Sequence, residues 1–235
     1  MLIGTTLISS IEFQGKMSLV IFFALCPLRC PYCHNKDILD SGIDESFEEI
    51  KMTIDKSLDY LDAVVITGGE PLVQLNDVIK VLEYVKSLNL KTKLDTSGIY
   101  PEKLEKLLKL DLLDYISLDV KAPFNKYKKI VGSDVGTCVK DSIDLINNYD
   151  NVTLELRTTY VPNLLNEKDI QKIASDVKGD IYTLQQFRNI NVLDESLNDV
   201  ESPSPYELEK IAKSLKNIFN GKIKIKSSEF GEEII

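Results

Sequence analysis

The segment SLVIFFALCPLRCPYCHN, residues 18–35, joins an unbroken apolar run to three cysteines within eight residues. The apolar run is typical of a buried strand. Cys26, Cys30 and Cys33 follow it in a C-x-x-x-C-x-x-C loop, and thiolates select soft metals, chiefly zinc and iron–sulfur clusters. Structural zinc sites usually close all four positions with two short clips, and the sequence has no second clip. A [4Fe-4S] cluster on three thiolates would keep one iron open to a substrate or cofactor; zinc is the alternative.

Outward from this segment, apolar β-branched runs alternate with amphipathic helical stretches, a pattern typical of parallel βα units. Six such units predict an α/β fold, a partial (βα)6 TIM-like barrel, because right-handed crossovers place successive parallel strands side by side. The predicted strands begin at Ser18, Ala63, Lys91, Tyr115, Val152 and Asp180.

We expect a single domain over residues 1–235. Residues 1–16 are predicted to form a short strand or hairpin, residues 17–190 the barrel, and residues 191–235 a C-terminal helix and strand. Apolar residues recur at helical spacing from Leu75 to Leu90 and predict a helix with one buried face. Further helix starts are predicted by two S-x-x-E capping patterns and two prolines: Ser46 with Glu49, Ser204 with Glu207, Pro101 and Pro205.

The bulk composition, with 43% hydrophobic and 28% charged residues, is that of an ordinary globular protein. A net charge of −9 argues against nucleic acid as a partner, because nonspecific affinity for phosphates comes from Lys and Arg. The basic patches KYKK (126–129) and KIKIK (222–226) are interpreted as solvated faces. The apolar runs are too short to cross a bilayer and the N-terminus lacks signal-peptide features, so we expect a cytoplasmic protein that binds no membrane.

The unusual polar residues follow or end predicted strands, at the carboxyl edge where α/β folds place their active sites. Paired glycines allow a ligand to approach the backbone closely, and a glutamate beside them can accept from an ammonium group. The candidates are Gly68, Gly69 and Glu70 after the second strand, Asp95 and Thr96 after the third, Asp119, Val120 and Lys121 at the fourth, Arg157 on the fifth, and Gln185, Gln186 and Arg188 at the sixth.

Each of these clusters has a structural alternative. The GGEP segment can be a tight turn alone, and Asp95 and Thr96 can cap the following helix. Asp119 and Lys121 share one strand face and can pair with each other. We expect Arg157 to point into the barrel mouth, with a salt bridge to a neighbouring strand as the alternative.

His34 is the only histidine, and it stands directly beside Cys33, which makes joint ligation of one ion awkward. We therefore interpret it as packing against the cluster or its ligand, with a fourth zinc ligand as the alternative. Tyr32 is predicted to form an aromatic wall at the same place. Cys138 stands far from the other cysteines and is interpreted as a buried small apolar residue.

With these residues in place, the chain resembles the radical S-adenosylmethionine enzymes, whose cysteine motif carries an aromatic residue before the third cysteine, here Tyr32. Within that superfamily it resembles the glycyl-radical enzyme activating enzymes, including activators of anaerobic ribonucleotide reductase and pyruvate formate-lyase that lack a ferredoxin-like module. The segments that carry the resemblance are FQGKMSLVIFFALCPLRCPYCHN, TGGEP, LDTSG and YISLDVKAP.

The resemblance implies that Cys26, Cys30 and Cys33 hold a [4Fe-4S] cluster and that S-adenosylmethionine chelates its open iron. It implies no catalytic side chain beyond this pocket. Relatives of the formate-lyase type have a histidine on the sixth strand, which Gln186 or Arg188 would replace here. The implied cofactor-binding residues are Tyr32, Cys33, His34, Gly68, Gly69, Glu70, Asp95, Thr96, Asp119, Val120, Lys121 and Arg157.

The activity implied is reductive cleavage of S-adenosylmethionine to a 5′-deoxyadenosyl radical, which removes hydrogen from a glycine of a partner glycyl-radical enzyme such as anaerobic ribonucleotide reductase. A flavodoxin or ferredoxin would donate the electron, under anaerobic conditions. Two alternatives are open. One is a radical S-adenosylmethionine enzyme that acts on a small molecule, resembling 7-carboxy-7-deazaguanine synthase; the other is a non-catalytic zinc-binding interaction domain.

Overall fold

A computed structural model describes residues 1–235, and the chain forms two compact units. Strands and helices alternate as predicted, so the α/β fold class is confirmed, and all six predicted strands are present. The predicted segmentation at residues 16 and 190 stays a prediction. Unit 1 consists of Met1–Pro27, Asp37–Thr96 and Glu102–Ser117, and unit 2 of Leu28–Lys36, Ser97–Pro101 and Leu118–Ile235.

Unit 1 is a mixed sheet with the strand order β3-β1-β2-β4-β5-β6, to which β6 contributes its first residues. Strands β2, β4 and β5 run parallel, whereas β1 is antiparallel to β2. Most residues of β2 and β4 are buried, which explains their continuous apolar sequences. The strands are β1 (Leu2–Ser9), β2 (Ser18–Phe23), β3 (Ile43–Asp44), β4 (Ala63–Gly68), β5 (Lys91–Thr96) and β6 (Tyr115–Asp119).

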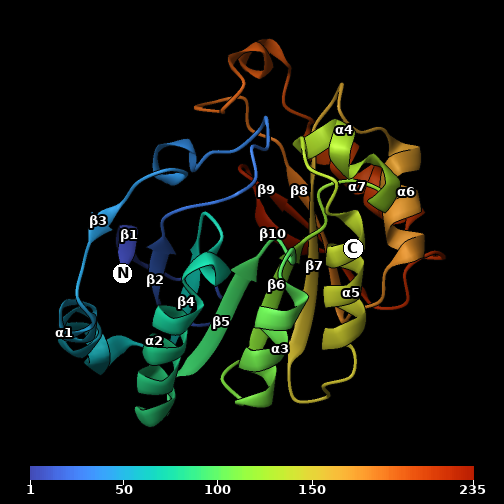
Figure 1. Ribbon diagram of the computed structural model, residues 1–235. Helices are drawn as coiled ribbons and strands as arrows, with labels where there is room; N and C mark the ends of the chain where they lie inside the picture. The colour runs from blue at the N-terminus through green and yellow to red at the C-terminus, as the bar shows by residue number, and fades with distance from the viewer. The chain divides into compact units, whose positions relative to one another are not determined.

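The helices of unit 1 begin where the sequence predicts. Ser46 and Glu49 form the full capping box at the start of α1, and the predicted helix from Leu75 is α2, which lies in front of β4 and β5 in Figure 1. The helices are α1 (Phe47–Ser57), α2 (Leu75–Ser87) and α3 (Pro101–Lys109).

Unit 2 continues from the end of β6 in the order β6-β7-β8-β9-β10. Strands β7, β8 and β9 are parallel, and β10 pairs antiparallel with β9, so KIKIKSS supplies the predicted further strand. Helices α6 and α7 pack beside one another, and α7 packs on β8 and β9 (Figure 1). The elements are β7 (Thr153–Tyr160), β8 (Ile181–Gln186), β9 (Lys222–Ser227), β10 (Gly231–Ile234), α4 (Tyr127–Val131), α5 (Gly136–Ile146), α6 (Glu167–Asp176) and α7 (Pro205–Ser214).

Five short 3₁₀ helices complete the chain, and one of them, η3, follows β4 directly. None of the helices combines the length and the apolar character needed to span a bilayer. The 3₁₀ helices are η1 (Lys36–Ile38), η2 (Leu58–Tyr60), η3 (Pro71–Gln74), η4 (Phe124–Lys126) and η5 (Glu195–Asp199).

Asp114 fastens the start of β6 to β5 in unit 1. Its carboxylate accepts hydrogen bonds from Lys91 Nζ at 2.7 Å, Lys86 Nζ at 2.8 Å, and the backbone N–H and hydroxyl of Thr92, both at 2.9 Å. Burial opposes ionisation of this carboxyl, but these donors outweigh burial and hold the pKa of Asp114 well below its usual range. The ionised carboxylate of Asp114 therefore stabilises the folded state through these hydrogen bonds.

Replacing Asp114 with Asn is expected to lower the free energy of unfolding at neutral pH by about 2 kcal/mol, since several charge-assisted hydrogen bonds are lost. Because the folded-state pKa lies below the unfolded value of about 3.9, this stabilisation is complete above that pH and is lost as the pH falls below it. Denaturant melts of wild type and Asp114→Asn should thus approach one another as the pH falls below about 4, and they should meet only below the folded-state pKa. Asp77→Asn, which removes only the exposed pair with Lys80 at 3.4 Å, is the control. A difference in stability that does not change with pH contradicts the assignment.

Candidate functional site

The loop that carries the first cysteine begins after β2, where the backbone that follows β4 is hydrogen-bonded to the backbone at the end of β2. Gly69 N–H donates to the Phe23 carbonyl and Glu70 N–H to the Leu25 carbonyl, both at 2.8 Å. Cys26 N–H in turn donates to the Leu39 carbonyl at 3.0 Å. These backbone bonds fix the position of Cys26 within unit 1.

The two glycines after β4 are required by this close approach. Gly68 has φ of +124°, which L side chains rarely adopt, and a Cβ there would lie 2.2 Å from the Phe23 carbonyl oxygen. A Cβ on Gly69 would lie 2.3 Å from the Leu25 carbonyl oxygen and 3.2 Å from Cys26 Cβ. The GGEP segment therefore has a structural role as a tight turn, because its glycines allow the backbone to pack against the start of the cysteine loop.

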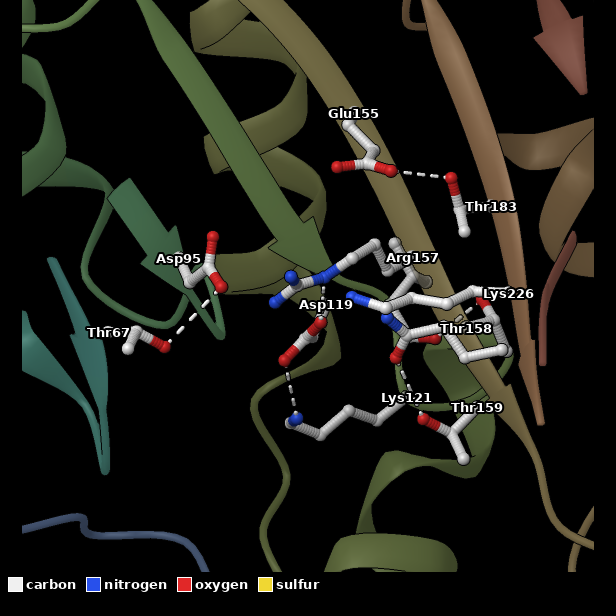
Figure 2. A network of polar contacts seen from close by, with 12 residues as sticks. Thr67, Asp95, Asp119, Lys121, Glu155, Arg157, Thr158, Thr159, Thr183 and Lys226 are labelled. Carbon is white, nitrogen blue, oxygen red and sulfur yellow. Dashed lines mark hydrogen bonds and ion pairs between the residues drawn. The ribbon is translucent and has the colours of Figure 1, made fainter. Parts of the chain in front are cut away.

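Glu70, Thr96 and Asp95 are buried at the carboxyl ends of β4 and β5. Glu70 is 0% exposed, and its carboxylate accepts from Leu72 N–H at 3.1 Å and from Thr96 Oγ1 at 2.9 Å. Asp95 accepts from Thr67 Oγ1 at 3.4 Å, as Figure 2 shows. Buried carboxylates are costly unless they are hydrogen-bonded, so their presence at one strand edge indicates a site for polar ligands.

In unit 2 the rest of the cysteine loop forms a turn in which Cys33 N–H donates to the Cys30 carbonyl at 3.0 Å. All the cysteines are free thiols. Burial raises the pKa of the Cys30 and Cys33 thiols, although the cation of Lys121 works in the opposite direction. Tyr32, between them, is buried, and its hydroxyl has no hydrogen-bond partner.

The donor set fits an iron–sulfur cluster better than any other metal centre, because three thiols in one loop are the only soft ligands in this stretch. The buried Tyr32 hydroxyl is a further polar atom that a ligand could satisfy. The structure gathers no three His, Cys, Asp or Glu side chains into a group that could hold a metal ion. The assignment of Cys26, Cys30 and Cys33 as ligands therefore stays a prediction, based on their spacing.

Asp119, at the end of β6, joins two cations of unit 2 (Figure 2). Its carboxylate accepts from Arg157 Nε at 2.9 Å and from Lys121 Nζ at 3.2 Å. Burial alone would raise its pKa, but Arg157 and Lys121 lower the pKa of Asp119 to about 2. Both structural alternatives, the Asp119–Lys121 pair and the salt bridge of Arg157 to a neighbouring strand, are thus present. Val120 is held to β7, since its N–H donates to the Arg157 carbonyl at 2.8 Å.

Three polar contacts tie the second part of the cysteine loop to the segment after β8. His34 Nδ1 lies 3.0 Å from the Ile190 carbonyl, Lys36 Nζ donates to the Val192 carbonyl at 3.3 Å, and Asp194 N–H donates to the Pro31 carbonyl at 2.8 Å. Burial and the nearby cation of Arg188 lower the pKa of His34, so its ring is neutral at neutral pH. Neutral His34 donates through Nδ1, a contact that no sequence motif indicated.

The replacement of the strand-six histidine by Gln186 or Arg188 stays a prediction; the Gln186 amide donates to the Pro203 carbonyl and to Glu229. Two other sequence-based interpretations are wrong. Cys138 is half-exposed within α5 rather than buried. The KIKIK patch is not a solvated face, since Lys224 is 4% exposed and pairs with Glu232 at 3.3 Å. The alternation of lysine and isoleucine was the signal that should have placed the lysines on one strand face.

The model of the radical SAM superfamily matches residues 20–177. The chain belongs to this superfamily. It is 39% identical to the Putative glycyl-radical enzyme activating enzyme MJ1227 of Methanocaldococcus jannaschii, over 91% of this chain and 90% of that protein. It is 29% identical to the pyruvate formate-lyase-activating enzyme of Clostridium pasteurianum, over 90% and 97%. The resemblance inferred from the motifs is therefore confirmed.

A more distant relative is the 7-carboxy-7-deazaguanine synthase of Methanocaldococcus jannaschii, 26% identical over 71% of this chain and 72% of that protein. Among solved structures, Streptococcus suis SuiB bound to the precursor peptide SuiA has a TM-score of 0.71 at 14% identity. It covers 89% of this chain, which in turn covers 48% of SuiB. The likeness establishes the fold, the partial TIM-like barrel of the radical SAM type.

Gly69→Ala is expected to destabilise the protein by at least about 2 kcal/mol, because the new methyl group meets backbone that no rotamer change can move. The same variant should bind less iron after anaerobic reconstitution, since Cys26 shifts with the Leu25 carbonyl. Thermal melting and iron content per chain measure the two effects. Gly132→Ala is the matched control, because a Cβ at Gly132 meets nothing within 4 Å although its φ is +77°. Equal losses in the two variants would show that the close approach at Gly69 has no special role.

Proposed function

We propose that this protein is a glycyl-radical enzyme activating enzyme, which cleaves S-adenosylmethionine and removes a hydrogen atom from a glycine of a partner enzyme. The observation that carries the proposal is the 39% identity to a protein of that description across 91% of the chain, with the three-cysteine motif and the TGGEP and LDTSG segments all in place. A flavodoxin or ferredoxin is the proposed electron donor.

In this proposal Cys26, Cys30 and Cys33 hold a [4Fe-4S] cluster. The cluster, when bound, supplies the electron that splits S-adenosylmethionine. The residues of the chain bind S-adenosylmethionine and orient it. Buried Glu70 would accept from the methionine ammonium group, and Gly69 has no side chain to cover its backbone.

Residues of unit 2 are also proposed to bind S-adenosylmethionine. Arg157 and Lys121 keep Asp119 ionised at neutral pH, so it can accept hydrogen bonds from ribose hydroxyls or an amino group. Buried Tyr32 would place an aromatic face and a free hydroxyl beside the cofactor. Tyr32, His34, Asp95, Thr96, Val120 and Lys121 stay predicted cofactor-binding residues.

A second candidate function is the modification of a small molecule, as in 7-carboxy-7-deazaguanine synthase. The 26% identity to such an enzyme favours it, but over a smaller share of the chain. Both candidates share the cluster and S-adenosylmethionine, so they differ only in what receives the radical. The zinc-binding interaction domain is the remaining alternative. It would differ from both enzyme candidates in containing zinc in place of iron and sulfide.

The test is anaerobic reconstitution with iron, sulfide and reductant, followed by incubation with S-adenosylmethionine and glycyl-radical enzymes encoded in the same genome. We expect brown protein, release of 5′-deoxyadenosine and methionine, and a glycine-centred paramagnetic signal on one partner. Cofactor cleavage without that signal on any partner would favour the small-molecule function. Colourless protein with one zinc per chain would contradict both.

Cys30→Ala is expected to reduce release of 5′-deoxyadenosine by at least about 100-fold, because two thiolates do not hold the cluster in place. Cys138→Ala, which removes a half-exposed thiol on α5, is the matched control and should retain both iron and cleavage. The measurement is chromatographic quantification of 5′-deoxyadenosine per chain. Cleavage that survives in Cys30→Ala would refute the assignment of the cluster ligands.

A further inference from the structure

Strand β10 forms one end of the sheet in unit 2, with β9 on one side and no strand on the other. Ile235 N–H donates to the Ile223 carbonyl at 2.9 Å, which fixes the direction of the hydrogen bonds along the ladder. Because hydrogen-bonded pairs alternate in an antiparallel ladder, Glu233 also directs its backbone groups toward β9, whereas Glu232 and Ile234 direct theirs outward. The outer edge of β10 therefore offers N–H and carbonyl groups to a further strand.

Exposed apolar side chains flank this edge. Tyr206, in the first turn of α7, is 77% exposed, and Phe230 and Ile234 are each 66% exposed. All three line one groove between the start of α7 and the β9–β10 hairpin, together with Ile225. Single exposed apolar side chains are common on protein surfaces, but a group of them beside an unpaired strand edge indicates a surface that binds another molecule.

The charged side chains of the groove are acidic. Its lining includes the carboxylates of Glu209 and Glu233 and no lysine or arginine. Lys213 pairs with Glu209 at 2.6 Å and so compensates its charge. Glu233 is exposed and forms no ion pair, because the lysines of β9 lie on the opposite face of the ladder, with Glu232. The carboxylate of Glu233 is therefore the charge that a cationic partner would meet.

A second copy of this chain fits the edge poorly. If two β10 strands paired antiparallel through their outer groups, Glu232 of each copy would pair with Ile234 of the other, and the two Glu233 side chains would stand directly opposite one another. Like charges in directly opposed positions destabilise a strand pair. A segment with a lysine or arginine at that position gains attraction instead, so charge favours a different protein as the occupant.

We propose that the outer edge of β10 and the adjoining groove bind an extended segment of another protein, which pairs antiparallel with β10. A lysine or arginine of that segment lies opposite Glu233, and apolar side chains two positions before and after it lie in the groove beside Phe230 and Tyr206. Backbone hydrogen bonds supply affinity, and the alternate side chains supply specificity. The inference goes beyond the proposed function, since docking at this edge requires neither the cluster nor S-adenosylmethionine.

The probe for this site is a capped heptapeptide of threonine, with isoleucine at its second and sixth positions and lysine at its fourth. We expect it to bind the reconstituted wild type. Glu233→Lys should raise its dissociation constant at least about fivefold at low ionic strength, because a cross-strand attraction becomes a repulsion. A second probe, with glutamate at the fourth position, should show the reverse preference. Fluorescence anisotropy of the labelled probes measures the affinities.

Glu195→Lys is the matched control, because Glu195 is exposed on η5, does not line the groove, and the variant makes the same change in net charge. It should bind both probes as wild type does. Equal effects of Glu195→Lys and Glu233→Lys would show that net charge alone matters and would overturn the proposal. A wild type that does not bind the lysine probe would overturn it as well.

A second measurement tests the backbone pairing. Methylation of a peptide nitrogen removes one donor, so it should weaken binding of the lysine probe about tenfold at its third and fifth positions, which pair with Ile234 and Glu232. At the second and fourth positions, where the N–H points away from β10, the change should be less than about twofold. Equal weakening at neighbouring positions would show that the probe adds no strand, which contradicts the proposal.

Sedimentation of the enzyme alone tests the other occupant. Ile234→Pro removes an outer N–H that β9 does not use, and we expect it to leave the mass of the enzyme in solution unchanged. A wild-type dimer that this variant dissociates would assign the edge to a second copy of the chain and overturn the proposal.

Discussion

The parallel pairing of β2 with β4, and its continuation beyond the strand ends, is the constraint on which the candidate site depends. The backbone N–H groups of Gly69 and Glu70 bond to carbonyls at Phe23 and Leu25, so the chain leaving β4 lies directly against the chain entering the cysteine loop. At positions 68 and 69 only glycine allows this approach, because a Cβ there would meet the Phe23 and Leu25 carbonyl oxygens. The same contact places Cys26 at the start of the loop and buries the carboxylate of Glu70 beside Thr96.

Charged side chains near the strand ends of unit 2 lie in ion pairs. Asp119 with Arg157 and Lys121, and Glu232 with Lys224 and Lys226, place cations and carboxylates on inner faces of unit 2. Such pairs add little net stability, since desolvation offsets most of the attraction. Arg157 and Lys121 do keep Asp119 ionised, and the pairs hold their side chains in defined positions. The net charge of −9 therefore says little about the interior of this protein.

Membership of the superfamily does not identify the substrate of this protein. The likeness to activating enzymes covers nearly the whole chain, and the similarity to a deazaguanine-forming enzyme is shorter. Because the chain is similar to both groups, this likeness alone does not distinguish a protein substrate from a small molecule.

The amino-acid sequence by itself determined the alternation of strands and helices, the six predicted strands, the α1 capping box and the superfamily, because each depends on local periodicity or on a short spaced motif. Only the tertiary structure decided which polar residues share a face. Gln185 and Gln186 are neighbours in sequence, yet one joins Thr159 and the other is bound by Pro203 and Glu229. Lys224 and Lys226 were indistinguishable from a solvated patch until β10 supplied Glu232. Composition and spacing do not specify these partners, because pairing across strands joins residues that the chain separates by tens of positions.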